Sequence, residues 1–112
     1  MGCFFIMKRE VYTKIGLFDE NFIISWADDS DYFLRMIKEG IAPVQTAQTM
    51  IWHPATSTTK KINNFSTYRN NNREYFEKKW GVPIENSPTL ITDLFYAYCK
   101  NLINTNITSN EK

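Results

Sequence analysis

Three carboxylates stand within four positions in the segment SWADDSDYFLRM, residues 25–36, and an apolar helical pattern starts among them. At this spacing the charges of Asp28, Asp29 and Asp31 repel one another, so the folded chain must compensate for them. Carboxylates in such a cluster can supply a general base, contribute to a metal site, or stabilise the N-terminus of a helix. The segment therefore has three candidate uses, and two of them are chemical.

A helix over residues 28–39, ended by Gly40, would separate the three acids in space. On such a helix Asp29 shares one face with three apolar residues at helical spacing: Phe33, Met36 and Ile37. We therefore expect Asp29 to point inward at the mouth of the helix. Burial there would raise the pKa of its carboxyl group and suit it to act as a base.

The other two acids have structural explanations. Asp31 lies four residues before Arg35, the order that favours an ion pair along a helix. Asp28 is well placed as the N-cap, whose side chain satisfies free backbone N–H groups. A calcium-binding loop fits poorly, because DDSD continues directly into YFLRM without the glycine and the later glutamate of an EF-hand.

The elements that must position these residues are helices and short strands. GCFFIM (2–7) and TMIWH (49–53) have the composition of buried strands. Helices are expected over residues 8–16, 28–39 and 62–80, with a last one that begins at Ser87-Pro88. A strand cannot stand alone, because its backbone groups need neighbouring strands. The pattern therefore predicts half of a larger α/β domain.

Composition limits the class of protein. The chain has 112 residues and a net charge of +1, which allows one small domain and indicates no nucleic-acid partner. No apolar run reaches the roughly 20 residues of a membrane span, and the first residues do not form a signal peptide. Membrane association is therefore not indicated, although the sequence does not exclude it. Two cysteines, Cys3 and Cys99, are too few for a disulfide framework, so we expect reduced thiols in a cytoplasmic protein.

Three segments taken in order carry a family resemblance: GCFFIMKREVYTKIGLFDENF, WADDSDYFLRMIKEGI and TMIWHPATST. Together they resemble the C-terminal half of family 2 glycosyltransferases, the nucleotide-sugar-dependent GT-A enzymes, over about residues 2–80. The resemblance implies an α/β fold, a partial GT-A fold that is helix-rich with a few short strands. Residues 1–82 would be this half-domain, 83–104 an additional C-terminal helix and 105–112 a flexible tail.

The resemblance also implies roles for single residues. The catalytic base of the family is usually the Asp of a Glu-Asp pair that opens this helix, which makes Asp29 the base and places Asp28 where the family has Glu. Trp26 would offer an apolar face to a sugar ring, or alternatively anchor the core. His53, the only histidine, would contact the metal or the diphosphate, although a lone histidine is more often structural. The substrate-binding residues implied are Trp26, Asp28, Asp31 and Arg35.

The implied reaction is the inverting transfer of a sugar from a nucleotide-sugar donor to a hydroxyl of a glycan acceptor, in the assembly of a surface polysaccharide. The complete enzyme would use a divalent cation, magnesium or manganese, whereas this chain alone is expected to bind none. We expect it to be inactive until an N-terminal half or a partner subunit supplies the donor site. Two alternatives stay open: a non-catalytic sugar-binding or protein-interaction module, and a small helical protein whose acids only cap a helix.

Overall fold

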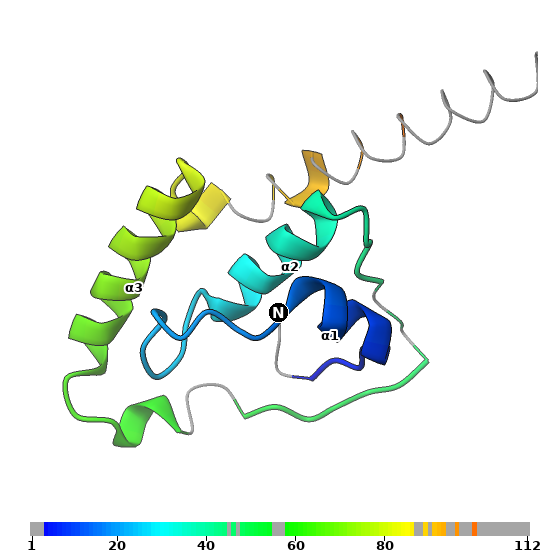
Figure 1. Ribbon diagram of the computed structural model, residues 1–112. Helices are drawn as coiled ribbons and strands as arrows, with labels where there is room; N and C mark the ends of the chain where they lie inside the picture. Colours follow the sequence, from blue (N-terminus) through cyan, green and yellow to red (C-terminus); the bar gives the residue numbers. More distant parts are fainter. Residues whose placement is uncertain are drawn as a thin grey trace, which may run out of the picture.

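The computed structural model describes residues 4–44, 46, 48–54, 58–86, 89, 91–93, 96 and 100. The α-helices of this part of the chain are α1 (Arg9–Ile15), α2 (Asp28–Lys38) and α3 (Phe65–Trp80). Two short 3-10 helices, η1 (Thr59–Lys61) and η2 (Ile84–Asn86), flank α3. α2 lies between α1 and α3 (Figure 1). The long segment between α2 and η1 runs without regular structure where it is described.

The predicted α/β fold, half of a GT-A sheet, is wrong, because the described residues contain no β-strand. Residues 4–7 of the first expected strand and residues 49–53 of the second have no regular structure, and no backbone hydrogen bond joins them. A strand forms only where a neighbouring strand exchanges backbone hydrogen bonds with it. Within the described chain neither segment has that neighbour, and most of their large apolar side chains stay exposed: Phe4, Ile6, Met50, Ile51 and Trp52.

The ends of the helices follow the sequence closely. α1 stops before Gly16 and α3 stops before Gly81. Their φ angles of 84° and 72° suit glycine, because at a positive φ a Cβ atom would crowd the neighbouring backbone. The helix predicted over residues 28–39 is confirmed as α2. The helix predicted over residues 62–80 is confirmed as α3, although it begins only at Phe65.

Some predictions fall outside the described residues. These are the start of the last helix at Ser87-Pro88, the tail 105–112 and both cysteines, Cys3 and Cys99. The described positions between Thr89 and Lys100 are helical.

α2 separates two apolar clusters, because it is covered on both flanks. The cluster toward α3 consists of five buried residues: Phe22, Ala27, Leu34, Phe76 and Ile84. The cluster toward α1 consists of four aromatic rings, Phe5, Phe18, Tyr32 and Phe33. Its closest pair, Phe18 and Tyr32, has ring centroids 4.5 Å apart. A helix covered on two sides also buries polar positions that a single apolar stripe would leave in solvent.

Asn72, on α3, fastens the loop before α2. Its side chain is buried, and its Nδ2 donates to the carbonyl oxygens of Ile23, Ser25 and Trp26 at 3.1, 2.9 and 3.1 Å. Its Oδ1 accepts the N–H of Ile23 at 3.0 Å. This one amide therefore satisfies backbone groups that burial would otherwise leave unpaired, and α3 fixes the conformation of residues 23–26.

We expect Asn72→Ala to lower the free energy of unfolding by about 3 kcal/mol, because it removes four part-buried hydrogen bonds to the loop, each worth roughly 0.5–1.5 kcal/mol. Urea denaturation followed by circular dichroism measures this change. The preceding residue, Asn71, is exposed and makes no hydrogen bond through its side chain to a described residue. Asn71→Ala is thus the matched control, with a change within about 0.5 kcal/mol. Equal effects of the two substitutions would contradict the role given to Asn72.

Candidate functional site

The acidic cluster follows a strained loop. Ile24, Trp26 and Ala27 have φ angles of 70°, 91° and 74°, a region that side chains other than glycine rarely adopt. Each such residue costs roughly 1–3 kcal/mol and persists only where the surrounding structure holds it. Here the hydrogen bonds of Asn72 to the loop supply that restraint. Backbone strain of this kind concentrates at functional sites, so it points to the residues that follow.

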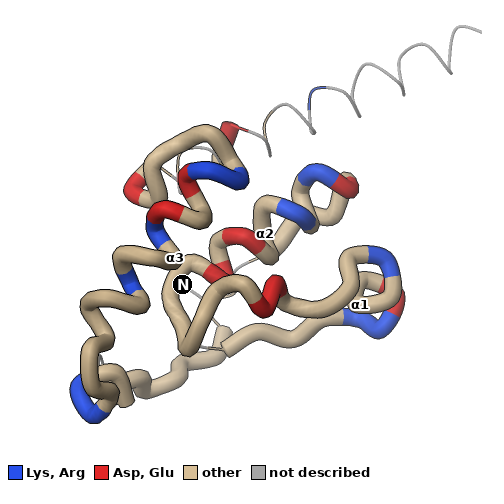
Figure 2. The backbone as a smooth tube through the Cα atoms, turned by 60° about the vertical axis from the view of Figure 1, so that its left-hand side comes forward, with Lys and Arg blue, Asp and Glu red and all other residues tan. Residues whose placement is uncertain are grey.

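Asp28 and Asp29 begin α2 directly after this loop, and acidic positions gather here beside α3 (Figure 2). The N-cap is Ala27 rather than Asp28 as predicted, and the Oδ1 of Asp28 accepts the Trp26 N–H at 3.0 Å. Asp29 is half-buried, and its Oδ1 accepts the N–H of Ser30 at 2.8 Å. Asp29 has no ion pair and no further side-chain hydrogen bond to another described residue. The carboxyl group of Asp29 is therefore not part of an ion-pair network among the described residues.

Burial raises the pKa of Asp29 above the ordinary value of an aspartate. The hydrogen bond from the Ser30 N–H lowers this pKa, the negative charge of Asp28 raises it again, and the net shift is upward. A carboxylate whose pKa is raised toward neutrality is a stronger base than an ordinary one. The prediction of a raised pKa at this position is confirmed.

The acid that α2 buries completely is Asp31, with 0% exposure, and not Asp29. Arg35 Nε and Trp80 Nε1 donate to its two oxygens at 2.9 Å each, and Lys79 Nζ lies 2.7 Å from Oδ1. The predicted ion pair of Asp31 with Arg35 is confirmed. It lies at the α2–α3 contact, because α3 covers a face of α2 that a single apolar stripe does not include.

Arg35 is engaged within the chain on several sides. Besides the bond to Asp31, its guanidinium donates to the carbonyl oxygens of Ile15 and Leu17 at 3.2 and 2.9 Å. Asp31 and Arg35 therefore hold α1, α2 and α3 together. Their contact with substrate stays a prediction.

Asp19, in the loop after α1, belongs to the same polar network and was missed at the level of sequence. Its Oδ2 accepts the Tyr75 hydroxyl at 2.8 Å and lies 2.6 Å from Lys79 Nζ. Burial alone would raise the pKa of Asp19, but the hydrogen bonds from Lys79, the Asn21 backbone and Tyr75 hold it well below its usual range. Burial likewise works against the charge of Lys79, yet its bonds to Asp19 and Asp31 raise its pKa.

Trp26 packs against the core, and two arginines of α3 lie over its indole ring. The guanidinium carbons of Arg69 and Arg73 are 4.8 and 5.6 Å from the ring centroid. The alternative of a core anchor therefore has direct support for Trp26. Its role as a platform for sugar stays a prediction.

His53 stands apart from the acidic cluster. It lies in the exposed irregular segment before η1, and no hydrogen bond or ion pair joins it to another described residue. Among the described residues no group of three or more histidine, cysteine, aspartate or glutamate side chains converges on a point that could hold a metal ion. The described residues thus offer no set of ligands for a divalent cation, and we derive no chemical step through one.

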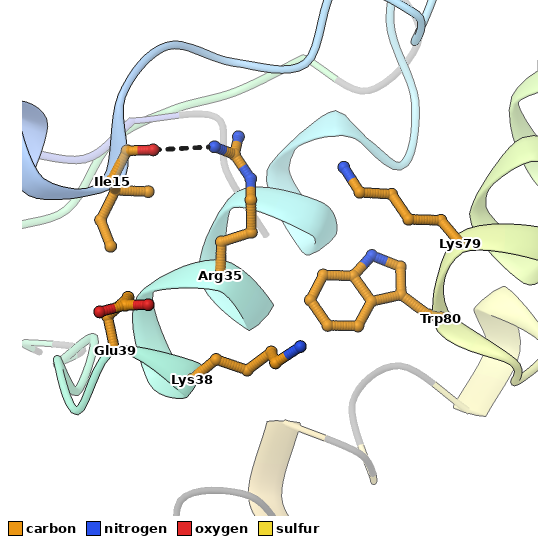
Figure 3. A pocket seen from close by; sticks show the side chains of 6 residues that line it. All are labelled: Ile15, Arg35, Lys38, Glu39, Lys79 and Trp80. Atoms are coloured by element: carbon orange, nitrogen blue, oxygen red, sulfur yellow. Dashed lines mark hydrogen bonds between the residues drawn. The ribbon is translucent and has the colours of Figure 1, made fainter.

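A cavity of the described chain lies between α2 and the end of α3 (Figure 3). It has a volume of about 340 Å³ and is lined by Ile15, Arg35, Lys38, Glu39, Lys79 and Trp80. Trp26, Asp29 and His53 do not line it. The expected site at the start of α2 is therefore separate from this cavity.

No family model, no curated protein and no solved structure matches this chain. Of the helices that the structure describes, none combines the length and the apolar character needed to cross a membrane.

Proposed function

We propose that this chain is the acceptor-binding and catalytic-base portion of an inverting glycosyltransferase. In the proposed reaction a hydroxyl oxygen of the acceptor forms a bond to the anomeric carbon of the donor sugar. The bond from that carbon to the diphosphate oxygen breaks, and the nucleoside diphosphate leaves with the electron pair. Asp29 takes the proton of the attacking hydroxyl. The proposed setting is cytoplasmic assembly of a surface polysaccharide.

The observation that carries the proposal is the state of Asp29. Its carboxyl group is half-buried at the first turn of α2, its pKa is raised, and it forms no ion pair with another described residue. Both carboxylate oxygens of Asp31, two residues further on, are instead bound by side chains of α2 and α3. The strained loop over residues 24–27 adds support, because it fixes the direction from which α2 starts.

The proposal includes a second component, a donor-binding segment in the same polypeptide or in a partner subunit. That segment would contribute the nucleotide-sugar site and the Asp-x-Asp that binds magnesium or manganese; the cation stabilises the leaving diphosphate when bound. The exposed apolar side chains support this idea. Ile6, Met50 and Trp52 are 85%, 94% and 87% exposed, so a contacting surface would remove much apolar area from water.

The test is reconstitution of transfer. The second component for this test is a segment that carries Asp-x-Asp, to be sought in the coding sequence directly upstream or in a neighbouring reading frame. Release of nucleoside diphosphate is measured for a panel of UDP-, GDP- and dTDP-sugars in the presence of glycan acceptors. We expect turnover with both components and none with this chain alone. If the combined components release no more diphosphate than the candidate segment alone, the proposal fails and a non-catalytic module becomes the better explanation.

The turnover of the reconstituted enzyme is expected to rise with pH through the pKa of Asp29, because only the carboxylate accepts a proton. Burial and the charge of Asp28 both raise this pKa, so the acidic limb should lie above the ordinary value of about 3.9. Asp28→Asn removes one of these causes and should move the limb to lower pH. A profile of kcat against pH measures both effects, and a limb that Asp28→Asn leaves in place would argue against Asp29 as the titrating base.

A further inference from the structure

Arg69 is an exposed cation that forms no ion pair with a described acid, and it lies over Trp26, two residues before the start of α2. It projects from α3 over the indole of Trp26, and it makes no hydrogen bond or ion pair with another described residue. Its neighbour Arg73 is different, because its Nη2 lies 2.7 Å from Glu85 Oε1. Of the two arginines on Trp26, only Arg69 keeps a charge that no described carboxylate pairs with.

The position of Arg69 suits recognition of an anion. A guanidinium held over an aromatic ring loses little freedom on binding, and its N–H groups stay available for a ligand. Those groups form a planar fork that matches a carboxylate or a phosphate with two parallel hydrogen bonds. An arginine on a flexible surface helix without such a platform would have to be ordered by the ligand itself.

The contacts of Trp26 place this cation beside the acidic cluster. The backbone N–H of Trp26 donates to Asp28, and Asn72 of α3 binds the Trp26 carbonyl oxygen. Neither Asp28 nor Asp29 forms an ion pair with Arg69. The carboxylates of Asp28 and Asp29 would repel an anionic ligand at this surface, and the positive charge of Arg69 offsets this repulsion.

We propose that Arg69, held over Trp26, binds an anionic group of the acceptor, a carboxylate or a phosphate carried by a saccharide. This inference rests on the proposed function and deepens it, because it names the class of acceptor. A uronic acid carries the carboxylate, and a sugar phosphate carries the phosphate. Each group presents two oxygens that can accept a pair of parallel hydrogen bonds from the guanidinium.

The experiment is a titration of the full chain, labelled with nitrogen-15, by nuclear magnetic resonance. The probes are glucuronate, glucose 1-phosphate, neutral glucose and inorganic phosphate. We expect saturable shifts of the Trp26 indole N–H and the Arg69 Nε–H with glucuronate or glucose 1-phosphate, and none with glucose. Binding of glucuronate would identify a carboxylate as the anionic group of the acceptor, and binding of glucose 1-phosphate would identify a phosphate. Added salt should weaken the binding, since the contact is exposed.

Arg69→Gln is expected to weaken this binding about tenfold, the loss typical of one charge-assisted contact. Arg9→Gln makes the same charge change at an exposed position on α1 and should leave the affinity unchanged. The inference is overturned if glucose shifts Trp26 equally, if neither anionic saccharide shifts it, or if Arg9→Gln weakens binding as much. The readout is binding without turnover, so its failure is distinct from a failure of Asp29 in the transfer assay.

Discussion

Asp29→Asn is expected to lower kcat of the reconstituted enzyme by about 10²- to 10⁴-fold, the contribution of a positioned general base. Asparagine has nearly the same shape and can still accept the Ser30 N–H, but it takes no proton from the acceptor hydroxyl. Steady-state release of nucleoside diphosphate at saturating donor and acceptor measures the effect. Asp93→Asn, the same substitution at an exposed aspartate, is the matched control and should leave kcat unchanged.

Stability separates a catalytic role of Asp29 from a structural one. Burial raises the pKa of Asp29, which means that its ionised form is less favourable in the folded chain than in the unfolded chain. The neutral asparagine removes this unfavourable charge, so the Tm at pH 7 should stay the same or rise slightly. A fall in Tm alongside the fall in kcat would assign Asp29 to the structure. An unchanged kcat would favour the non-catalytic module.

Asp31→Asn is expected to lower the free energy of unfolding by about 3–5 kcal/mol, because it removes the buried carboxylate that pairs with both Arg35 and Lys79. Asp31 is fully buried, and Arg35, Lys79 and Trp80 all direct donors at its oxygens. The asparagine amide would place two more donors among them. Such a loss is a large part of the 5–15 kcal/mol that stabilises a typical domain. Urea denaturation at pH 7 measures the change.

Two further variants make the stability test specific. Asp93→Asn controls for the loss of an aspartate charge and should change the free energy of unfolding by less than about 0.5 kcal/mol. Trp80→Phe removes only the indole donor to Asp31 and should cost less than Asp31→Asn, with a folded chain remaining for measurement. If Asp31→Asn lowers the free energy of unfolding by less than about 1 kcal/mol, water solvates Arg35 and Lys79 in place of the carboxylate. The hydrogen bonds and ion pairs of Asp31 would then not be what joins α2 to α3.

The sequence by itself determined where α1, α2 and α3 lie and where α1 and α3 end, because these features depend on neighbours within one helical turn. Glycines 16 and 81 mark the ends of α1 and α3, since only a residue without Cβ adopts their φ angles easily. The Asp31–Arg35 pair followed from the same local geometry, four residues apart. The position of Asp29 in the first turn of α2, with a raised pKa, was likewise predicted from spacing.

Only the tertiary structure decided which surfaces of these helices are covered. The spacing of one apolar stripe put Asp29 on the buried face, whereas α3 covers another face and buries Asp31. Two sets of contacts join residues about 50 to 60 positions apart: the hydrogen bonds of Asn72 to the loop, and the ion pair of Asp19 with Lys79. A local sequence pattern does not predict contacts at such separations. The two strand predictions were wrong for the same reason. GCFFIM and TMIWH have the composition of strands, but a strand forms only where another segment supplies its backbone hydrogen bonds. The described chain contains no segment that pairs with either of them.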